Sequence, residues 1–178
     1  MKLIILDRDG VINEDADDYV KSPQEFIPIP GSIEAIGRLN KAGYTVAVAT
    51  NQSGLARGYY DAATLQAMHD KLAMLLLPVA GHIDAFFICP HGPDDHCACR
   101  KPKTGLFGQI AKHYQTDLNG VVAVGDSFRD LQAAMAVGAQ PVLVKTGKGL
   151  RTLQKNAQEL RAIPVYADLA ACVDDLLR

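Results

Sequence analysis

The sequence predicts an α/β fold with a Rossmann-like parallel sheet and helices on both of its faces. Short β-rich runs alternate with longer helical patterns, the order that gives a parallel sheet. The β-rich runs are almost continuously apolar, as strands buried on both faces are. The chain has 178 residues with no internal repeat, low-complexity tract or interdomain linker. We therefore expect a single domain over residues 1–178.

Five runs are strand candidates: Lys2–Leu6, Thr45–Ala49, Ala85–Ile88, Gly120–Val124 and Pro141–Val144. The helix candidates are Ser32–Lys41, Asp61–Leu77, Thr104–His113, Phe128–Val137 and Ala167–Leu177. The first helix is expected to stop at Ala42-Gly43, and Asp61 is a candidate N-cap of the second. Ligands of parallel sheets bind beyond the carboxyl ends of the strands, so the residues after each run are candidate site residues.

Composition narrows the class of protein. Hydrophobic residues make up 48% of the chain and charged residues 21%, which is ordinary for a globular protein. The formal net charge of −2 gives no basic field for nucleic acid or anionic lipid. No run approaches the roughly 20 apolar residues of a membrane span, and Asp7 ends the first apolar run too early for a signal peptide. We expect a cytoplasmic monomer without nucleic-acid or membrane partners.

Four polar clusters stand at strand ends or before a helix: Asp7-Arg8-Asp9-Gly10, Thr50-Asn51-Gln52-Ser53-Gly54, Arg100-Lys101-Pro102, and Gly125-Asp126-Ser127 with Asp130. The strand-end rule brings all four to one edge of the sheet. Carboxylates this close raise one another's pKa unless a cation intervenes, and Mg²⁺ prefers such oxygen ligands. A carboxylate can attack phosphorus, and a second can act as acid and base. Each cluster alone is explained by a turn, a cap or a surface charge; the ordered set points to phosphoryl transfer.

In this order and spacing the clusters resemble the four motifs of the haloacid dehalogenase superfamily, over essentially the whole chain. The resemblance implies that Asp7 is the nucleophile and Asp9 the general acid and base. It implies that Thr50 and Lys101 hold the phosphoryl group. Asp7, Asp126 and the backbone carbonyl of Asp9 would hold magnesium. An Asp two residues after the nucleophile marks phosphatases rather than dehalogenases, so we expect a Mg²⁺-dependent phosphomonoester hydrolase that forms an aspartyl-phosphate.

A cysteine–histidine loop spans about residues 89–99. Cys89, Cys97 and Cys99 lie within eleven residues, and with His91 they make a closed tetrahedral zinc set, which would be structural. His96 is the alternative imidazole, but its place beside Cys97 crowds chelation. Free thiols in a surface loop are the other explanation. The loop is too polar and proline-rich to pack a core, so zinc is a sound way to order it.

The zinc loop narrows the resemblance to a branch of the superfamily that contains heptose-bisphosphate and histidinol-phosphate phosphatases. It implies removal of the 7-phosphate of D-glycero-D-manno-heptose 1,7-bisphosphate, in the ADP-heptose supply of lipopolysaccharide cores. Histidinol phosphate, in histidine biosynthesis, is the alternative substrate. The chain lacks a large insertion, so we expect no cap domain and only a short flap over Gly10–Pro30. Substrate contacts are expected from Asp15, Tyr19, Asn51, Gln52, Ser53 and Arg100, the last gripping a second anionic group.

Two functions from other classes compete. A phospho-receiver signalling domain also uses Asp, Thr, Lys and magnesium, but it carries its phosphoacceptor after the third strand, which here ends in Ile88-Cys89. A zinc-organised nucleic-acid binder is opposed by the near-neutral charge.

The remaining motifs predict structural roles. Gly147-Lys148-Gly149 is interpreted as a strand-end loop, because the glycine spacing of a Walker motif is missing. Cys172 is expected to be a small buried hydrophobe. The three histidines without ligand-spaced partners are expected at the surface or at an edge: His69, His82 and His113.

Overall fold

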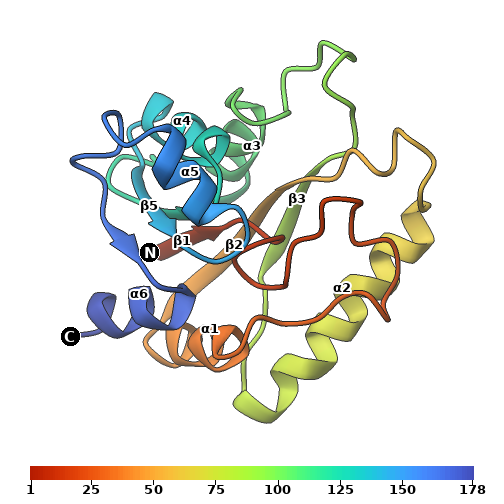
Figure 1. Ribbon diagram of the computed structural model, residues 1–178. Coiled ribbons are helices and arrows are strands. Elements are labelled where there is room, and N and C mark those ends of the chain that lie inside the picture. Colours follow the sequence, from red (N-terminus) through yellow and green to blue (C-terminus); the bar gives the residue numbers. More distant parts are fainter.

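The computed structural model describes all 178 residues and contains one six-stranded parallel sheet (Figure 1). The strands are β1 (Lys2–Leu6), β2 (Tyr44–Asn51), β3 (Ala85–Cys89), β4 (Val122–Gly125), β5 (Gln140–Val144) and β6 (Val165–Tyr166). Their order across the sheet is β3-β2-β1-β4-β5-β6, and every neighbouring pair is parallel. The predicted fold class is confirmed.

The helices connect these strands. They are α1 (Ser32–Lys41), α2 (Ala62–Leu76), the 3-10 turn η1 (Leu77–Val79), α3 (Gly105–Tyr114), α4 (Phe128–Ala136), α5 (Gly149–Lys155) and α6 (Leu169–Leu176). Asp61 is the N-cap of α2, as predicted: its carboxylate accepts a hydrogen bond of 2.8 Å from the Thr64 amide. The last helix begins two residues later than predicted, because the Asp168 side chain caps it through the Ala171 amide.

Side-chain alternation along the strands divides the interior into two cores. Ile4 and Leu6 of β1 pack on one face of the sheet with residues of α1, α2 and α6. Leu3 and Ile5 pack on the other face with residues of α3 and α4. Successive side chains of a strand point to opposite faces, so both sides of the central strand are buried. Figure 1 shows α1, α2 and α6 on one side of the sheet and α3 and α4 on the other.

The structure differs from the prediction where elements are short or begin at a glycine. β4 begins at Val122 because Gly120 lies in a turn with φ of +76°. β6 and α5 were not predicted: β6 has two residues and α5 seven, too few for a periodic pattern to stand out. Gly149, which was interpreted as part of a loop, is the first residue of α5.

The strand order fixes where a site can form. β1 pairs with β2 on one side and with β4 on the other, so the chain reverses its direction across the sheet beside β1. This switch point opens a crevice beyond the carboxyl ends of β1 and β4. The predicted flap over Gly10–Pro30 contains no helix or strand, only isolated bridges at Asn13. No helix has the length and apolar character needed to cross a membrane.

Candidate active site

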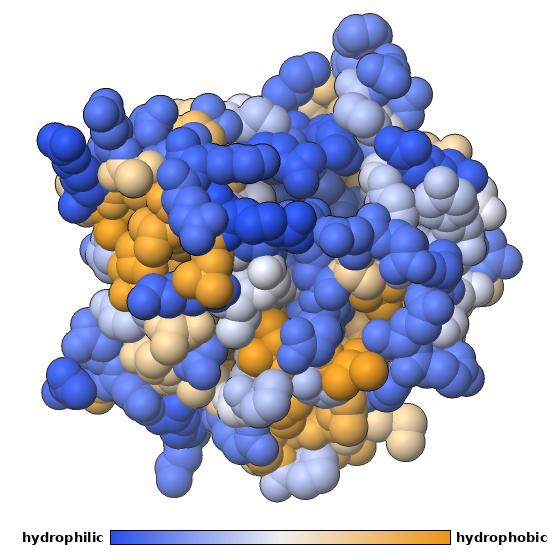
Figure 2. Space-filling model, in the orientation of Figure 1, coloured by the Kyte–Doolittle hydropathy of each residue, from blue (hydrophilic) through white to orange (hydrophobic).

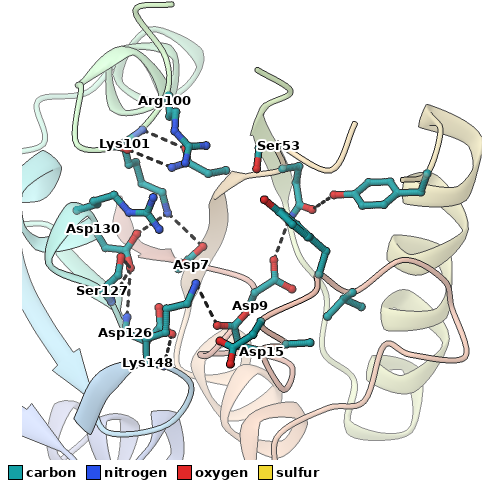
Figure 3. Close-up of a pocket in the computed structure, with 18 residues that line it drawn as sticks. Asp7, Asp9, Asp15, Ser53, Arg100, Lys101, Asp126, Ser127, Asp130 and Lys148 are labelled. Carbon is teal, nitrogen blue, oxygen red and sulfur yellow. Dashed lines mark hydrogen bonds and ion pairs between the residues drawn. The ribbon is translucent and has the colours of Figure 1, made fainter. Parts of the chain in front are cut away.

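A cavity of about 190 Å³ lies at this edge of the sheet, and all four predicted polar clusters contribute to its lining (Figure 3). The sequence-predicted residues that line it are Asp7, Asp9, Asp15, Tyr19, Asn51, Gln52, Ser53, Arg100, Lys101 and Asp126. Thr50 is fully buried and does not line the cavity. The cysteine–histidine residues lie outside it.

Three carboxylates meet at the floor of the cavity. Asp7 follows β1, Asp126 follows β4, and Asp130 lies in the first turn of α4; one oxygen of each lies within 4.8 Å of the others. Lys101 Nζ is 3.1 Å from Asp7 Oδ1 and 2.7 Å from Asp130 Oδ1. One cation therefore faces three carboxylates, and the cluster keeps an excess of negative charge.

The pKa values reflect this excess. Burial, followed by the charge of Asp130, raises the pKa of Asp7 to about 7. Burial and the charge of Asp130 also raise the pKa of Asp126 well above its usual range. Burial alone would raise the pKa of Asp130 too, but Lys101 lowers it. A divalent cation would offset the remaining charge, and the Asp7 and Asp126 oxygens form the hard donor set that Mg²⁺ prefers.

Close backbone approach holds Asp126 in place. A Cβ atom on Gly10 or on Gly147 would overlap the Asp126 carboxylate, and both glycines have positive φ, +87° and +56°. The Lys148 amide donates a 2.7 Å hydrogen bond to Asp126 Oδ2. The Thr152 hydroxyl donates one of the same length to the Asp126 carbonyl. The loop after β5 and helix α5 thus orient an aspartate that follows β4.

Asp9 lies in a different electrostatic environment. Its Oδ1 accepts hydrogen bonds from the Arg8 guanidinium and from Asn13, and its Oδ2 accepts one of 2.9 Å from Gln52. Burial alone would raise the pKa of Asp9, but the charge of Arg8 and these hydrogen bonds lower it. The two aspartates of the first motif are therefore shifted in opposite directions, Asp7 upward and Asp9 downward.

Arg8 is fully buried and joins Asp9 to α2. Its Nη1 lies 3.3 Å from His69 Nε2, and the His69 ring stacks on Phe86 at 3.9 Å. Burial, followed by the charge of Arg8, lowers the pKa of His69 to about 4. The predicted surface position of His69 was wrong, because the buried Arg8 needs an acceptor from α2. His82 and His113 are exposed, as predicted.

The second motif orients its neighbours. The Asn51 side chain accepts a hydrogen bond from the Lys101 amide and donates one to the Lys101 carbonyl. Gln52 donates to Thr50 Oγ1 at 2.7 Å and accepts a hydrogen bond from the Tyr60 hydroxyl. Asn51 therefore fixes the backbone of Lys101, while Gln52 links Asp9 to Thr50.

Sequence reasoning gave no site role to several residues that line this cavity, and three of them are charged side chains close to predicted site residues. Asp130 pairs with Lys101, Lys148 pairs with Asp15 at 3.3 Å, and Arg129 lies between Ser127 and Asp130 in the first turn of α4. Asp130 belongs to the fourth predicted motif, so its position was available from the sequence. Lys148 follows the fifth strand, and the strand-end rule could have identified it. Arg129 does not directly follow a strand, so the strand-end rule could not have identified it.

Arg100 is placed as predicted, on the cavity wall beside Lys101 (Figure 3). Its guanidinium forms no ion pair and no hydrogen bond, and its Nη1 is buried without a partner. Burial and then the charge of Arg129 lower the pKa of Arg100. The guanidinium is therefore available to an acidic ligand.

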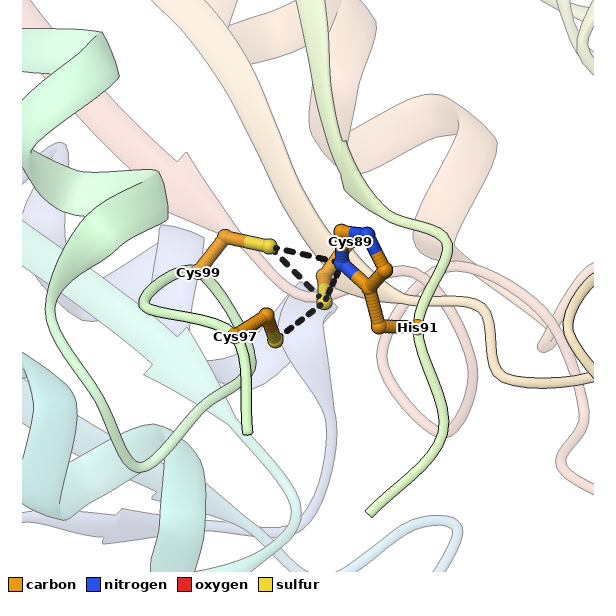
Figure 4. Close-up of side chains that lie close together, drawn as sticks. All are labelled: Cys89, His91, Cys97 and Cys99. Atoms are coloured by element: carbon orange, nitrogen blue, oxygen red, sulfur yellow. Dashed lines mark hydrogen bonds between the residues drawn. The ribbon is translucent and has the colours of Figure 1, made fainter. Parts of the chain in front are cut away.

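The cysteine–histidine loop brings its four predicted ligands together (Figure 4). Cys89 Sγ is 3.7 Å from both Cys97 Sγ and His91 Nδ1 and 3.0 Å from Cys99 Sγ. Zn–S bonds of about 2.3 Å place the sulfurs of a tetrahedral site roughly 3.8 Å apart. The Cys89–Cys97 separation matches this value, whereas Cys99 lies closer to Cys89 than zinc-bound sulfurs do; the four side chains form a set that could hold a zinc ion after a small adjustment of Cys99. Cys172 is buried in the apolar core, as predicted, and lies apart from this set.

Comparison with known proteins agrees with the geometry. The family model described as "HAD-hyrolase-like" matches residues 98–172. The chain is 60% identical to the D-glycero-beta-D-manno-heptose-1,7-bisphosphate 7-phosphatase of Pseudomonas putida, over 99% of this chain and 100% of that protein. It is 57% identical to the protein of the same name from Bordetella bronchiseptica, over 100% and 99%.

A solved structure is similar throughout. It is the D,D-heptose 1,7-bisphosphate phosphatase of B. bronchiseptica in complex with magnesium and phosphate, with a TM-score of 0.96 at 57% identity over 99% of this chain and 98% of that one. The phosphatase of the same name from Burkholderia thailandensis has a TM-score of 0.75 at 44% identity, over 99% of each chain. This chain therefore belongs to the heptose-1,7-bisphosphate 7-phosphatase family of the haloacid dehalogenase superfamily.

Proposed function

We propose that the chain hydrolyses the 7-phosphate of D-glycero-β-D-manno-heptose 1,7-bisphosphate, with magnesium, through an aspartyl-phosphate on Asp7. The observation that carries this proposal is the position of Asp7, next to Lys101 and Asp126 on the floor of a cavity lined by all four motifs. The names of relatives at 57 to 60% identity support the substrate and its β anomer. This function belongs to the ADP-heptose supply of lipopolysaccharide cores.

The chemistry divides between the two aspartates of the first motif. The Asp7 carboxylate attacks phosphorus and the bond to the sugar oxygen breaks. Asp9 must carry a proton at this step, although its surroundings favour the ionised form, and it gives that proton to the sugar oxygen. Asp9, now ionised, takes a proton from water, which attacks the phosphoryl group and releases phosphate from Asp7. The hydrogen bonds from Arg8, Asn13 and Gln52 stabilise the ionised Asp9 that the second step needs.

The other residues hold and neutralise the phosphoryl group. Lys101 supplies a buried positive charge beside Asp7, and Asp130 positions it. Magnesium, held by Asp7, Asp126 and the Asp9 backbone carbonyl, would neutralise further charge on the phosphoryl oxygens. Thr50 is proposed to contact the phosphoryl group, and Asp15, Tyr19, Asn51, Gln52, Ser53 and Arg100 to bind or frame the sugar and its second phosphate.

The cysteine–histidine set is proposed to hold structural zinc, because four protein ligands leave no open position for chemistry. It orders the segment that leads into Arg100 and Lys101. We also propose that residues 1–178 act as one domain, since one sheet contains strands from Lys2 to Tyr166. The cytoplasmic location and the monomeric state stay predictions.

A phosphate-release screen tests the function. The substrates are both anomers of heptose 1,7-bisphosphate, other sugar bisphosphates and histidinol phosphate, each with magnesium. We expect the highest kcat/KM for the β-heptose bisphosphate and release of a single phosphate, with the anomeric phosphate retained in the product by ³¹P NMR. A preference for histidinol phosphate would overturn the substrate, and phosphorylation of Asp7 without turnover would favour a receiver domain.

A further inference from the structure

Two arginines from different parts of the chain face the same cavity. Arg100 follows the cysteine–histidine loop, and Arg129 lies in the first turn of α4. Both line the main cavity, and both also line an adjoining cavity of about 300 Å³ that includes Lys103 and His96. The pair therefore stands where the catalytic cavity meets a second, basic cavity.

Neither arginine has an acidic partner within the protein. No ion pair or side-chain hydrogen bond involves either guanidinium, and Arg100 Nη1 is buried and unpartnered. Arg8, the other arginine at this site, differs: its guanidinium contacts Asp9, His69 and Met68. Buried polar groups nearly always have a partner, so the Arg100 donor calls for an acceptor from outside the chain.

The two guanidiniums also repel each other. Guanidinium groups are cations, and like charges at a partly buried site destabilise one another unless an anion lies between them. Guanidinium groups donate pairs of hydrogen bonds in a fixed plane, a geometry that matches two oxygens of a phosphate. A phosphate group between Arg100 and Arg129 would supply the missing acceptor and remove the repulsion.

This phosphate is not the reacting one. The reacting group must reach Asp7, where Lys101 already provides a cation at 3.1 Å. Neither Arg100 nor Arg129 pairs with Asp7, Asp126 or Asp130. The arginine pair is thus suited to a second anion carried by the same substrate.

We propose that Arg129 is a specificity-determining residue which, together with Arg100, binds the non-reacting phosphate of a bisphosphate substrate. The proposal rests on the proposed function and deepens it by assigning the second phosphate to a pair of residues. It also gives a physical reason for preferring a bisphosphate to histidinol phosphate, which has no second phosphate to bridge the arginines.

The test compares two substrates that differ only in the anomeric phosphate: heptose 1,7-bisphosphate and heptose 7-phosphate. For Arg129→Gln we expect the ratio of their kcat/KM values to fall by about 10- to 100-fold, the loss of a charge-assisted contact. The loss should fall mainly on KM for the bisphosphate, since the contact forms before the chemistry. For Arg129→Lys the ratio should fall less, because lysine keeps the positive charge although it cannot form the paired hydrogen bonds.

Two further variants sharpen the result. Lys112→Gln removes one positive charge from the exposed last turn of α3 and should leave the ratio unchanged. The second variant combines Arg100→Gln with Arg129→Gln. Expressed as free energies, its loss in the kcat/KM ratio should be smaller than the sum of the two single losses, because the two side chains share one ligand.

The outcomes separate the inference from the proposed function. If the wild-type enzyme does not prefer the bisphosphate, the proposed substrate fails. If it does, but Arg129→Gln lowers kcat/KM equally for both substrates or for neither, Arg129 does not read the second phosphate and the inference is overturned. Strictly additive losses for Arg100 and Arg129 would contradict a shared ligand.

Discussion

The two clusters of side chains that could hold a metal ion are built in opposite ways. Asp7, Asp126 and Asp130 come from positions far apart in the sequence, and the sheet brings them together at the ends of β1 and β4. Cys89, His91, Cys97 and Cys99 lie within eleven residues, and only Cys89 belongs to a strand. No helix or strand forms between Cys89 and Gly105. Figure 3 shows Asp7, Asp126 and Asp130 coming together from separate segments, and Figure 4 shows Cys97 and Cys99 on one loop close to Cys89 and His91.

The difference teaches what each cluster needs. The carboxylates are held by the fold itself, through Lys101, the backbone amides and two glycines that permit close approach. These contacts hold the carboxylates in place despite their mutual repulsion. We therefore expect a cation bound there to exchange without loss of structure. The cysteine loop has no such frame, so we expect its order to depend on the proposed zinc ion. The surface agrees: Figure 2 shows hydrophilic residues around the hollow of the active site and over the loop beside it.

The largest expected effect comes from brief chelation. Removing magnesium should abolish turnover, and magnesium alone should restore it, because a few oxygen ligands exchange readily. Elemental analysis after the treatment should still find about one zinc per chain, as a closed four-ligand site predicts. Activity that returns only when zinc is added would show that the two clusters are not separable.

Next comes Asp7→Asn, which should lower steady-state turnover to below about one hundredth of wild type. An amide cannot attack phosphorus and is a poorer magnesium ligand. The circular dichroism spectrum and the zinc content should stay at wild-type values, since Asp7 is not one of the proposed zinc ligands and lies far from them in the sequence. Turnover above that level would contradict the nucleophile assignment.

A smaller loss is expected for Cys97→Ser. A serine hydroxyl is a poor zinc ligand, so zinc should be lost and the segment leading into Arg100 and Lys101 should loosen. We expect activity to fall by about 10- to 100-fold, with the three aspartates unchanged. Zinc-free protein with full activity, or a disulfide between two of these cysteines in active protein, would overturn the zinc site.

The smallest effect is expected for Cys172→Ala, the matched control. Cys172 lies in the apolar core and contacts no other cysteine. The variant should keep its zinc and its activity and lose about 1 kcal/mol of unfolding free energy, the cost of one small buried group. Thermal denaturation gives this value, and loss of zinc would place Cys172 in the metal site after all.

Most of the site was predictable because its signal is local. The buried strands, the four motifs and the cysteine–histidine set are patterns within a few residues. The structure has strands at the predicted runs, brings the four motifs to one cavity and brings the four cysteine and histidine side chains together. Errors appeared where a signal was short or depended on a distant partner. β6 and α5 are too short for periodicity, and His69 was misplaced because its burial depends on Arg8, 61 residues away.

The sequence by itself determined which residues could do chemistry, since residue type and spacing at strand ends define the candidates. Only the tertiary structure decided how they pair: Lys101 between Asp7 and Asp130, Asn51 on the Lys101 backbone, and Arg100 beside Arg129. These pairs follow from the strand order β3-β2-β1-β4, which sets the neighbours of β1. Hydrophobic periodicity reports whether a strand is buried but not which strand lies next to it, so the pairings had to come from the folded chain.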